Sequence, residues 1–405
     1  MSQSVKFTEW HLKRANTYFR GLLTFLAKEE QVRHIMSLPT EKVIPNVRNG
    51  TEDSQATEEL SEQVYYAIAS VYVVLAVIAF IFNTLVLVVF MKDSSLRSHS
   101  NILILSIAIG DWIQAVVAYP LGVVGILSKS WQTTGTTCSC YGFIVAFLSF
   151  GTMLHHATFA IERAIVIKFS FSFSIVNKLK YIIVGLWLFA LIWSSLPLIG
   201  WSGYAPEGGR SVCSIDWQSS DPSAVAYIWC IFVLFFLAPF ITMVTAYGSI
   251  YRNVKRMTQT AHNIWGEYAA QTLETILAES RTARMACIMS FCFLFAWTPY
   301  AAVSLYAIIR APEPAISPLM ATLPALFAKT APCYNPLIYF LLFKKFRSSL
   351  RKVLRPLPIC RRFLRQESSG GNMEVISRLT ASDDKENTSK PNEVLPRQVQ
   401  DAVTI

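Results

Sequence analysis

Long stretches without a charged side chain are the feature of this sequence that most restricts its fold. Such stretches cover residues 64–91, 112–127, 130–161, 181–206, 222–251 and 285–309, and only 15% of all residues are charged. The hydrocarbon core of a bilayer takes about 20 helical residues. The second stretch reaches that length with residues 102–110 before it, and a seventh, residues 314–343, contains one charge, Lys329. Because backbone groups inside lipid must pair with one another, we expect an all-α membrane protein, a bundle of seven transmembrane helices.

The basic residues between these stretches predict the orientation of the chain. The loops after the first, third and fifth predicted helices carry 11 Lys and Arg residues, against 3 in the alternate loops. Lys and Arg concentrate in cytoplasmic loops, so we expect an extracellular N-terminus and a cytoplasmic C-terminus. The expected location is the plasma membrane. Asn49, in Asn-Gly-Thr, is then a candidate glycosylation site.

The composition outside the bundle suggests three further parts. We expect an extracellular tail over residues 1–62, the bundle over 63–342, an amphipathic cytoplasmic helix over 343–356 and a disordered cytoplasmic tail over 357–405. Cys360, just past the amphipathic stretch, is a candidate palmitoylation site. The net charge of +10 is explained by anionic lipid at the cytoplasmic face. Nothing in the sequence indicates nucleic-acid binding, and no Cys or His cluster has metal-site spacing.

Lys329 lies near the middle of the seventh stretch, 15 residues after its start and 14 before its end. At 1.5 Å per residue the ammonium cannot reach either membrane surface, and a charged Lys at the centre costs about 2.5–3.5 kcal/mol or more. One interpretation is chemical, because a desolvated neutral amine can attack a carbonyl and form a Schiff base. The other is a structural ion pair with Asp111 or a buried polar contact. The residue types alone leave both open.

The motifs around Lys329 resemble those of the rhodopsin-like G-protein-coupled receptors. The matching positions run from the first predicted helix to the seventh: Asn83, Asp111, Glu162-Arg163, Trp187, Pro239, Tyr247, Phe293-x-x-x-Trp297-x-Pro299 and Asn335-Pro336-x-x-Tyr339. A Lys seven residues before the last of these Pro residues is the mark of the opsins, in which it carries retinal as a Schiff base. The resemblance covers about Val64 to Leu354 and implies retinal, 11-cis or all-trans, as the cofactor.

The segment before the fifth predicted helix resembles the loop that caps retinal in opsins. It reads Tyr204-Ala205-Pro206-Glu207 and then Cys213-Ser214-Ile215-Asp216-Trp217. The resemblance implies a disulfide from Cys213 to Cys138 at the outer end of the third helix, which an oxidising compartment permits. Cys140 is the rival partner, and the family spacing to Arg163 favours Cys138.

A protonated Schiff base in an apolar pocket needs a negative partner. Vertebrate visual opsins have a Glu where this sequence has Tyr141, and no acid occurs between Cys138 and Ile161. By resemblance to many invertebrate and non-visual opsins, Glu207 is the candidate counterion; the alternative is an exposed loop acid beside Arg210. The resemblance places Trp297, Tyr300 and Phe293 at the ring end of the retinal site.

The predicted cytoplasmic ends carry the residues that such receptors use as a switch. An ion pair between Arg163, which follows Glu162, and Glu279 would hold the dark state closed. Tyr247 and Tyr339 would bond to Arg163 once the bundle opens, and Asn335 would join Asn83 and Asp111 in a polar network. The family has the triplet Asp/Glu-Arg-Tyr, whereas this sequence has Glu162-Arg163-Ala164. The replacement of Tyr by Ala weakens the expectation of G-protein coupling. His155 and His156 are expected to be packed and hydrogen-bonded.

Two functions therefore remain. The first is a light-sensing opsin, not an enzyme, that signals to a heterotrimeric G protein, with arrestin and receptor kinase acting at its Ser/Thr-rich tail. The second is a retinal photoisomerase with little signalling, because Gly200-Trp201-x-Gly203-Tyr204 and Leu326-Phe327-Ala328-Lys329 look most like the peropsin, retinal-isomerase and neuropsin branch. The switch residues favour the first. An ion pump would need acids in the third helix, and a receptor for another ligand would leave Lys329 unexplained.

Overall fold

The computed structural model describes residues 60–97, 101–128, 135–169, 178–208, 212–263, 267–310 and 316–354. The side chains of 260–263, 267–273 and 275 are not described. A separate unit, Met1–Ala56, lies outside the described residues, as do Asn49, Cys360 and the tail 357–405.

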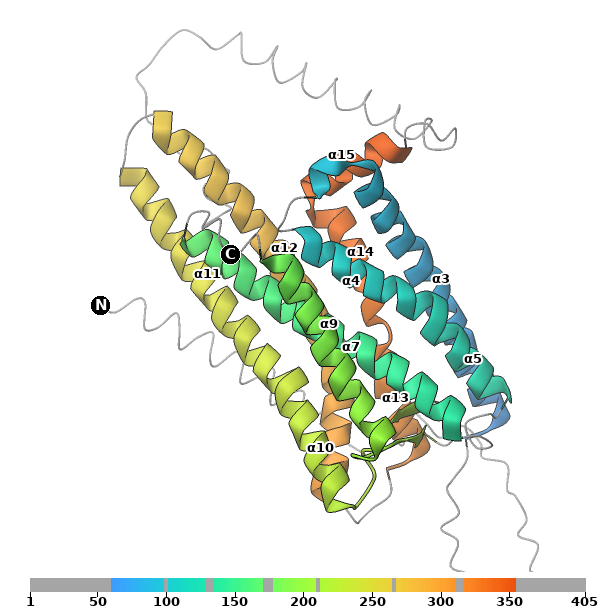
Figure 1. The fold of residues 1–405 in the computed structure, drawn as a ribbon. Helices are drawn as coiled ribbons and strands as arrows, with labels where there is room; N and C mark the ends of the chain where they lie inside the picture. The colour runs from blue at the N-terminus through green and yellow to red at the C-terminus, as the bar shows by residue number, and fades with distance from the viewer. Residues whose placement is uncertain are drawn as a thin grey trace, which may run out of the picture. The chain divides into compact units, whose positions relative to one another are not determined.

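Among the described residues, six helical segments are long and apolar enough to cross a membrane (Figure 1). They are α3 (Glu62–Lys92), α4 (Ile102–Ile113) continued by α5 (Tyr119–Ser128), α7 (Gly135–Lys168), α9 (Leu179–Ser195) continued by the turn Leu196–Ile199, α10 (Pro222–Phe232) continued by α11 (Ala238–Asn263), and α12 (Glu267–Arg310). Helix α7 packs against α4, α9, α11 and α12, so residues along it face most of the bundle interior. The predicted all-α membrane fold is confirmed.

The seventh crossing consists of two shorter helices, α13 (Pro318–Ala328) and α14 (Ala331–Leu342), separated by a turn at Lys329 and Thr330. Pro332 explains the break, because it has no N–H to donate and its ring would clash with the carbonyl four residues earlier. Near the start of α14 the missing N–H costs nothing. The charge that interrupts the apolar stretch therefore lies where the helix itself is interrupted.

Two other prolines follow turns of π-helix. Residues Gln114–Ala118 form such a turn ahead of Pro120, and Val233–Leu237 form one ahead of Pro239. In both cases the carbonyl that the proline ring would meet, four residues earlier, lies inside the wider turn, which accommodates the ring without ending the helix. The segments that contain Pro120 and Pro239 thus continue through their prolines.

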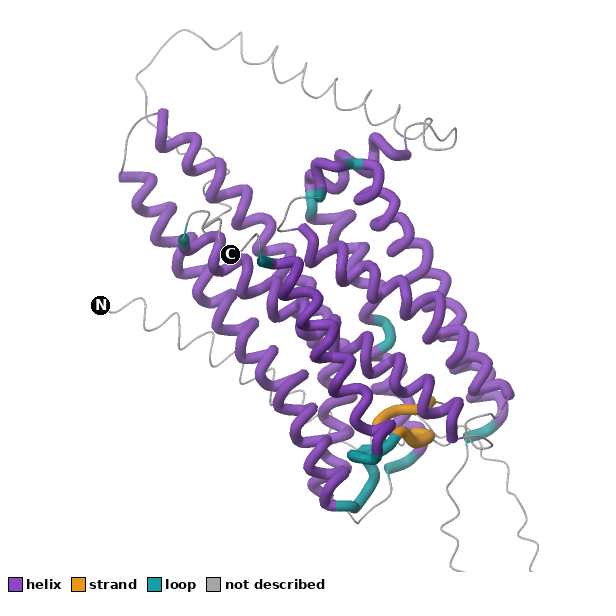
Figure 2. Tube along the Cα trace, viewed as in Figure 1, coloured by secondary structure: helices purple, strands orange, loops and turns teal. Residues whose placement is uncertain are grey.

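A hairpin covers one end of the bundle (Figure 2). Strand β1 (Tyr204–Glu207) pairs antiparallel with β2 (Val212–Ile215), and Glu207 lies opposite Val212. The hairpin lies close to α7 because Gly142 has no side chain: a Cβ at that position would come within 2.5 Å of the Tyr204 ring.

Helix α15 (Lys344–Leu354) folds against the opposite end of the bundle, beside the short turn Ser94–Leu96. Phe346 is fully buried among the bundle side chains. The Ser349 hydroxyl donates a hydrogen bond of 2.6 Å to Asp93, and that bond together with those from Ser95 lowers the pKa of Asp93 to about 2. The predicted amphipathic helix over 343–356 corresponds to α15.

Candidate functional site

A mostly apolar cavity of about 150 Å³ lies between α7, α10, α12, α13 and the hairpin. Its walls are mainly aromatic and aliphatic, and the ionisable Lys and Glu side chains on its lining are Lys329 and Glu207. Such a cavity, apolar with a few convergent polar groups, is the usual form of a small-molecule site.

Lys329 lines the cavity and is 7% exposed. Because the helix breaks at this residue, its carbonyl lies outside the regular helical ladder and accepts a hydrogen bond of 2.6 Å from the Tyr119 hydroxyl. The Lys329 Nζ lies 5.8 Å from the centroid of the Tyr72 ring, over its face. Asp111 instead accepts a hydrogen bond of 2.9 Å from Asn335, and forms no ion pair with Lys329 within the described residues. The Tyr119 hydroxyl thus fixes the backbone of Lys329 at the cavity wall.

Glu207 is buried at the end of β1, only 2% exposed, and lines the same cavity. This rules out the alternative of an exposed loop acid. The Tyr300 hydroxyl donates to its Oε2 at 3.3 Å. Burial raises the pKa of the Glu207 carboxyl, and Ser214, Lys329, Trp217 and Tyr300 oppose that rise. A positive charge on the Lys329 nitrogen would therefore favour the ionised carboxylate.

Tyr141 is buried but lies behind the cavity wall, not on it. Its hydroxyl is 3.3 Å from that of Tyr72, whose ring faces the Lys329 amine. Gly122 makes room for both rings, because a Cβ there would come within 2.8 Å of Tyr72 and 3.2 Å of Tyr141. No sequence pattern singles out Tyr72 or Gly122, since an aromatic residue or a glycine in an apolar helix is ordinary.

Three aromatic residues expected at the ring end of the site, Phe293, Trp297 and Tyr300, all line the cavity. The Trp297 ring stacks on Phe293 and meets Tyr300 edge-on, with centroids 6.0 Å apart in both pairs. Its indole N–H is buried without a hydrogen-bond partner among the described residues. These three rings therefore form an aromatic part of the cavity wall with one unused donor.

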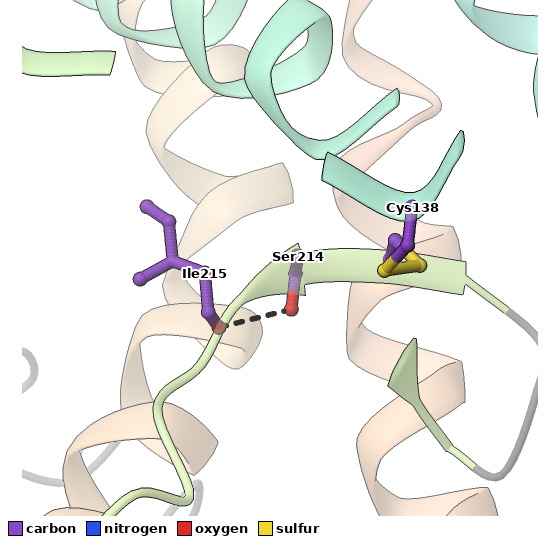
Figure 3. Close-up of a disulfide and its surroundings, with 4 residues drawn as sticks. Cys138, Ser214 and Ile215 are labelled. Carbon is purple, nitrogen blue, oxygen red and sulfur yellow. Dashed lines mark hydrogen bonds between the residues drawn. A yellow bond between two sulfur atoms is a disulfide. The ribbon is translucent and has the colours of Figure 1, made fainter. Parts of the chain in front are cut away.

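A disulfide between Cys138 and Cys213 joins α7 to the hairpin (Figure 3). The neighbouring Ser214 hydroxyl donates to the Ile215 carbonyl at 3.2 Å. The rival Cys140 is exposed and free. The predicted pairing is confirmed. The disulfide holds β2, which pairs with the strand that carries Glu207, over the cavity.

At the other end of the bundle, Arg163 bonds to two acids. It forms an ion pair with adjacent Glu162, and its Nη1 lies 2.9 Å from Oε2 of Glu279 on α12. Arg163 and Glu162 are each 3% exposed and Glu279 is 26% exposed. The pair between α7 and α12 is thus present, as expected.

The other expected switch residues lie between this end and the cavity. The Tyr247 hydroxyl is 3.0 Å from that of Ser290 on α12, whereas the Tyr339 hydroxyl is buried without a partner in the described part of the chain. Pro336 is buried within α14 beside Asn335. Asn83 donates to the carbonyl of Pro332 at 3.1 Å, three residues before Asn335. Among the described residues, Asn83 forms no hydrogen bond with Asn335 or with Asp111.

The two histidines of α7 differ from one another. His155 is hydrogen-bonded as expected, to the Ser106 hydroxyl at 3.0 Å and the Gly151 carbonyl at 2.7 Å. His156 is packed against Phe293, with ring centroids 4.7 Å apart. Neither of its nitrogens has a partner among the described residues, so the expectation of a hydrogen bond is wrong for His156.

Comparison with known proteins decides the family. The model of the "7 transmembrane receptor (rhodopsin family)" matches residues 82–339, more than half of the chain. The chain belongs to this family. It is a multi-pass membrane protein. Lys329, in its seventh crossing, stands seven residues before Pro336, as the opsin motif described above requires.

Several relatives are opsins by name. Melanopsin-B of Xenopus laevis is 29% identical over 321 residues, which cover 78% of this chain and 59% of that protein. The visual pigment-like receptor peropsin of Homo sapiens is 28% identical over 313 residues, covering 75% and 89%. The crystal structure of squid rhodopsin matches with a TM-score of 0.69 at 28% identity, over 75% of this chain and 89% of that one. The match thus spans less than two thirds of the melanopsin but most of the peropsin, and the opsin resemblance is confirmed.

Proposed function

We propose that this chain is a light-sensing opsin that binds retinal through Lys329 and signals to a G protein. The observation that carries the proposal is a lysine amine and a buried carboxylate on the wall of one aromatic-lined cavity in a rhodopsin-family bundle. A buried Lys without an ion-pair partner among the described residues is costly, and covalent attachment of an aldehyde explains its presence.

The residues of the cavity fit retinal. Its apolar walls suit a polyene, and Lys329 supplies a nitrogen that condenses with an aldehyde with loss of water. When bound, retinal supplies a double bond that isomerises on absorbing light. Glu207 would hold a proton on the Lys329 nitrogen, and Tyr300, by donating to Glu207, would orient the carboxylate.

The signalling half of the proposal rests on the ion pair between α7 and α12. Arg163 and Glu279 join the two helices at the end away from the cavity, and Trp297 and Phe293 place the cavity wall on α12. A displacement of α12 at the cavity would therefore strain this pair, which is the two-state element that allosteric coupling requires.

Replacing Glu279 by Ala should raise G-protein activation in the dark about fivefold, because loss of an ion pair contributing about 1 kcal/mol shifts a two-state equilibrium by that factor. The measurement is nucleotide exchange on purified G protein in darkness. The matched control is Glu274→Ala, which removes an exposed acid from the same helix and should leave dark exchange unchanged. Equal dark exchange in Glu279→Ala and the native chain would contradict a closing role for the pair.

The second candidate is a photoisomerase, favoured by Ala164, which follows Arg163 and packs against the same buried cluster as Tyr247. The family's Tyr hydroxyl is thus missing from the G-protein face. Illumination of the pigment should distinguish the two functions. A receptor keeps its isomerised retinal and activates G protein, whereas an isomerase loaded with all-trans retinal yields 11-cis retinal in the extract without nucleotide exchange.

The remaining assignments follow from the same proposal. The protein would lie in the plasma membrane with its N-terminus outside, which places the hairpin at the extracellular end and Arg163 at the cytoplasmic end. The G protein would bind beside Arg163, and arrestin and receptor kinase would act on the Ser/Thr-rich tail. Asn49 would be glycosylated and Cys360 palmitoylated.

A further inference from the structure

A second pocket lies between α11 and α12, at the end of the bundle where Arg163 pairs with Glu279. It is a groove formed by facing sides of the two helices and is separate from the cavity around Lys329. On α11 the lining residues recur every three or four positions, from Tyr247 to Thr258, and on α12 they do so from Ser280 to Cys287. This spacing places each set along one face of its helix.

The groove combines an apolar floor with basic side chains. Ile250, Val254 and Ala283 are buried along it. Lys255 on α11 and Arg284 on α12 are exposed and line it from opposite helices, and none of its lining residues is an acid. A site with an apolar floor and two cations, one from each wall, is complementary to an amphiphile with an anionic head.

A buried hydroxyl points to the same ligand chemistry. Thr258 lines the groove and is 8% exposed, but its hydroxyl has no hydrogen-bond partner in the described part of the chain. A buried polar group without a partner destabilises the folded state. An oxygen-rich head group held by Lys255 and Arg284 would supply the acceptor that the Thr258 hydroxyl lacks.

We propose that this groove binds an anionic phospholipid of the cytoplasmic leaflet. Its phosphate lies between Lys255 and Arg284, and one acyl chain lies along the apolar floor. Basic pockets between transmembrane helices on the cytoplasmic side are suited to anionic lipid head groups. The inference uses the proposed orientation of the chain but not retinal binding, so it can fail or succeed independently of the light-sensing function.

The bound lipid would connect α12, which carries Glu279 of the switch, to its neighbour α11. Tyr247 lines the groove and also bonds across to Ser290 on α12. A phosphate held from both α11 and α12 would add a second bridge beside that hydrogen bond. The lipid therefore stabilises the observed arrangement of the two helices and raises the temperature at which the bundle unfolds.

The test uses the purified full chain in detergent, titrated with phosphatidylinositol 4-phosphate and, separately, with phosphatidylcholine of the same acyl chains. Native mass spectrometry counts the bound lipids, and thermal unfolding is followed in parallel. We expect the phosphoinositide to bind at least tenfold more tightly and to raise the unfolding temperature. Replacing both Lys255 and Arg284 by Gln should remove that preference, and Thr258→Val should weaken it severalfold.

The matched control is Arg256→Gln with Arg281→Gln, which removes the same charge from the same two helices at residues that do not line the groove. These variants should keep the lipid preference within twofold, and their unfolding without lipid shows whether each variant folds. Equal loss in both double variants would overturn the site in favour of general charge attraction. Equal binding of phosphatidylcholine, or of soluble inositol phosphate without acyl chains, would overturn an anionic lipid as the occupant.

Discussion

Replacing Lys329 by Ala should abolish formation of a light-absorbing pigment with retinal. The side chain is the amine of the cavity, and without it the aldehyde has no nitrogen to condense with there. Lys329→Arg should fail as well, although it keeps the charge, because guanidinium stays protonated and is not a nucleophile. The measurement is the absorption spectrum of purified variants after incubation with retinal.

The matched control removes a lysine outside the cavity, Lys344→Ala on α15, and should give a full pigment band. Unfolding temperatures of the unliganded proteins show that each variant has folded. A visible, light-sensitive band in Lys329→Ala would contradict attachment at this residue.

Replacing Glu207 by Gln should move the pigment absorption toward the ultraviolet at neutral pH. The carboxylate supplies a negative charge at the cavity wall, and without it the Lys329 nitrogen loses its proton more readily in an apolar site. Since that proton is needed for visible absorption, lowering the pH should restore the visible band in Glu207→Gln. A spectral titration measures both effects.

Asp216→Asn is the control for this experiment. Asp216 follows β2 in the same loop but does not line the cavity, so its replacement should leave the visible band unchanged. An unaltered spectrum in Glu207→Gln across the titration would remove Glu207 from the role of counterion.

The sequence predicted the parts of the structure that have large energetic consequences. Charge inside a bilayer is expensive, so charge-free stretches located the helices, and Lys329 was conspicuous as an exception. The Cys138–Cys213 disulfide and the position of Glu207 followed from motif resemblance. In the structure Cys213 and Glu207 both line the cavity, and the disulfide joins the hairpin to α7.

Other features had no sequence signature. Tyr72 and Tyr119 contact Lys329 from α3 and α5, but aromatic residues in apolar helices usually pack without further role. The groove between α11 and α12 was missed because Lys255 and Arg284 resemble ordinary basic residues of a cytoplasmic loop. Their shared pocket depends on how the two helices pack, which local patterns do not contain.

The most direct test of the account is the absorption spectrum of the native chain, purified and incubated separately with 11-cis and all-trans retinal, before and after illumination. The account predicts a visible band with at least one isomer, carried by the protein and altered by light. Absence of a protein-bound band with both isomers, from a chain shown to be folded by its thermal unfolding, would contradict it.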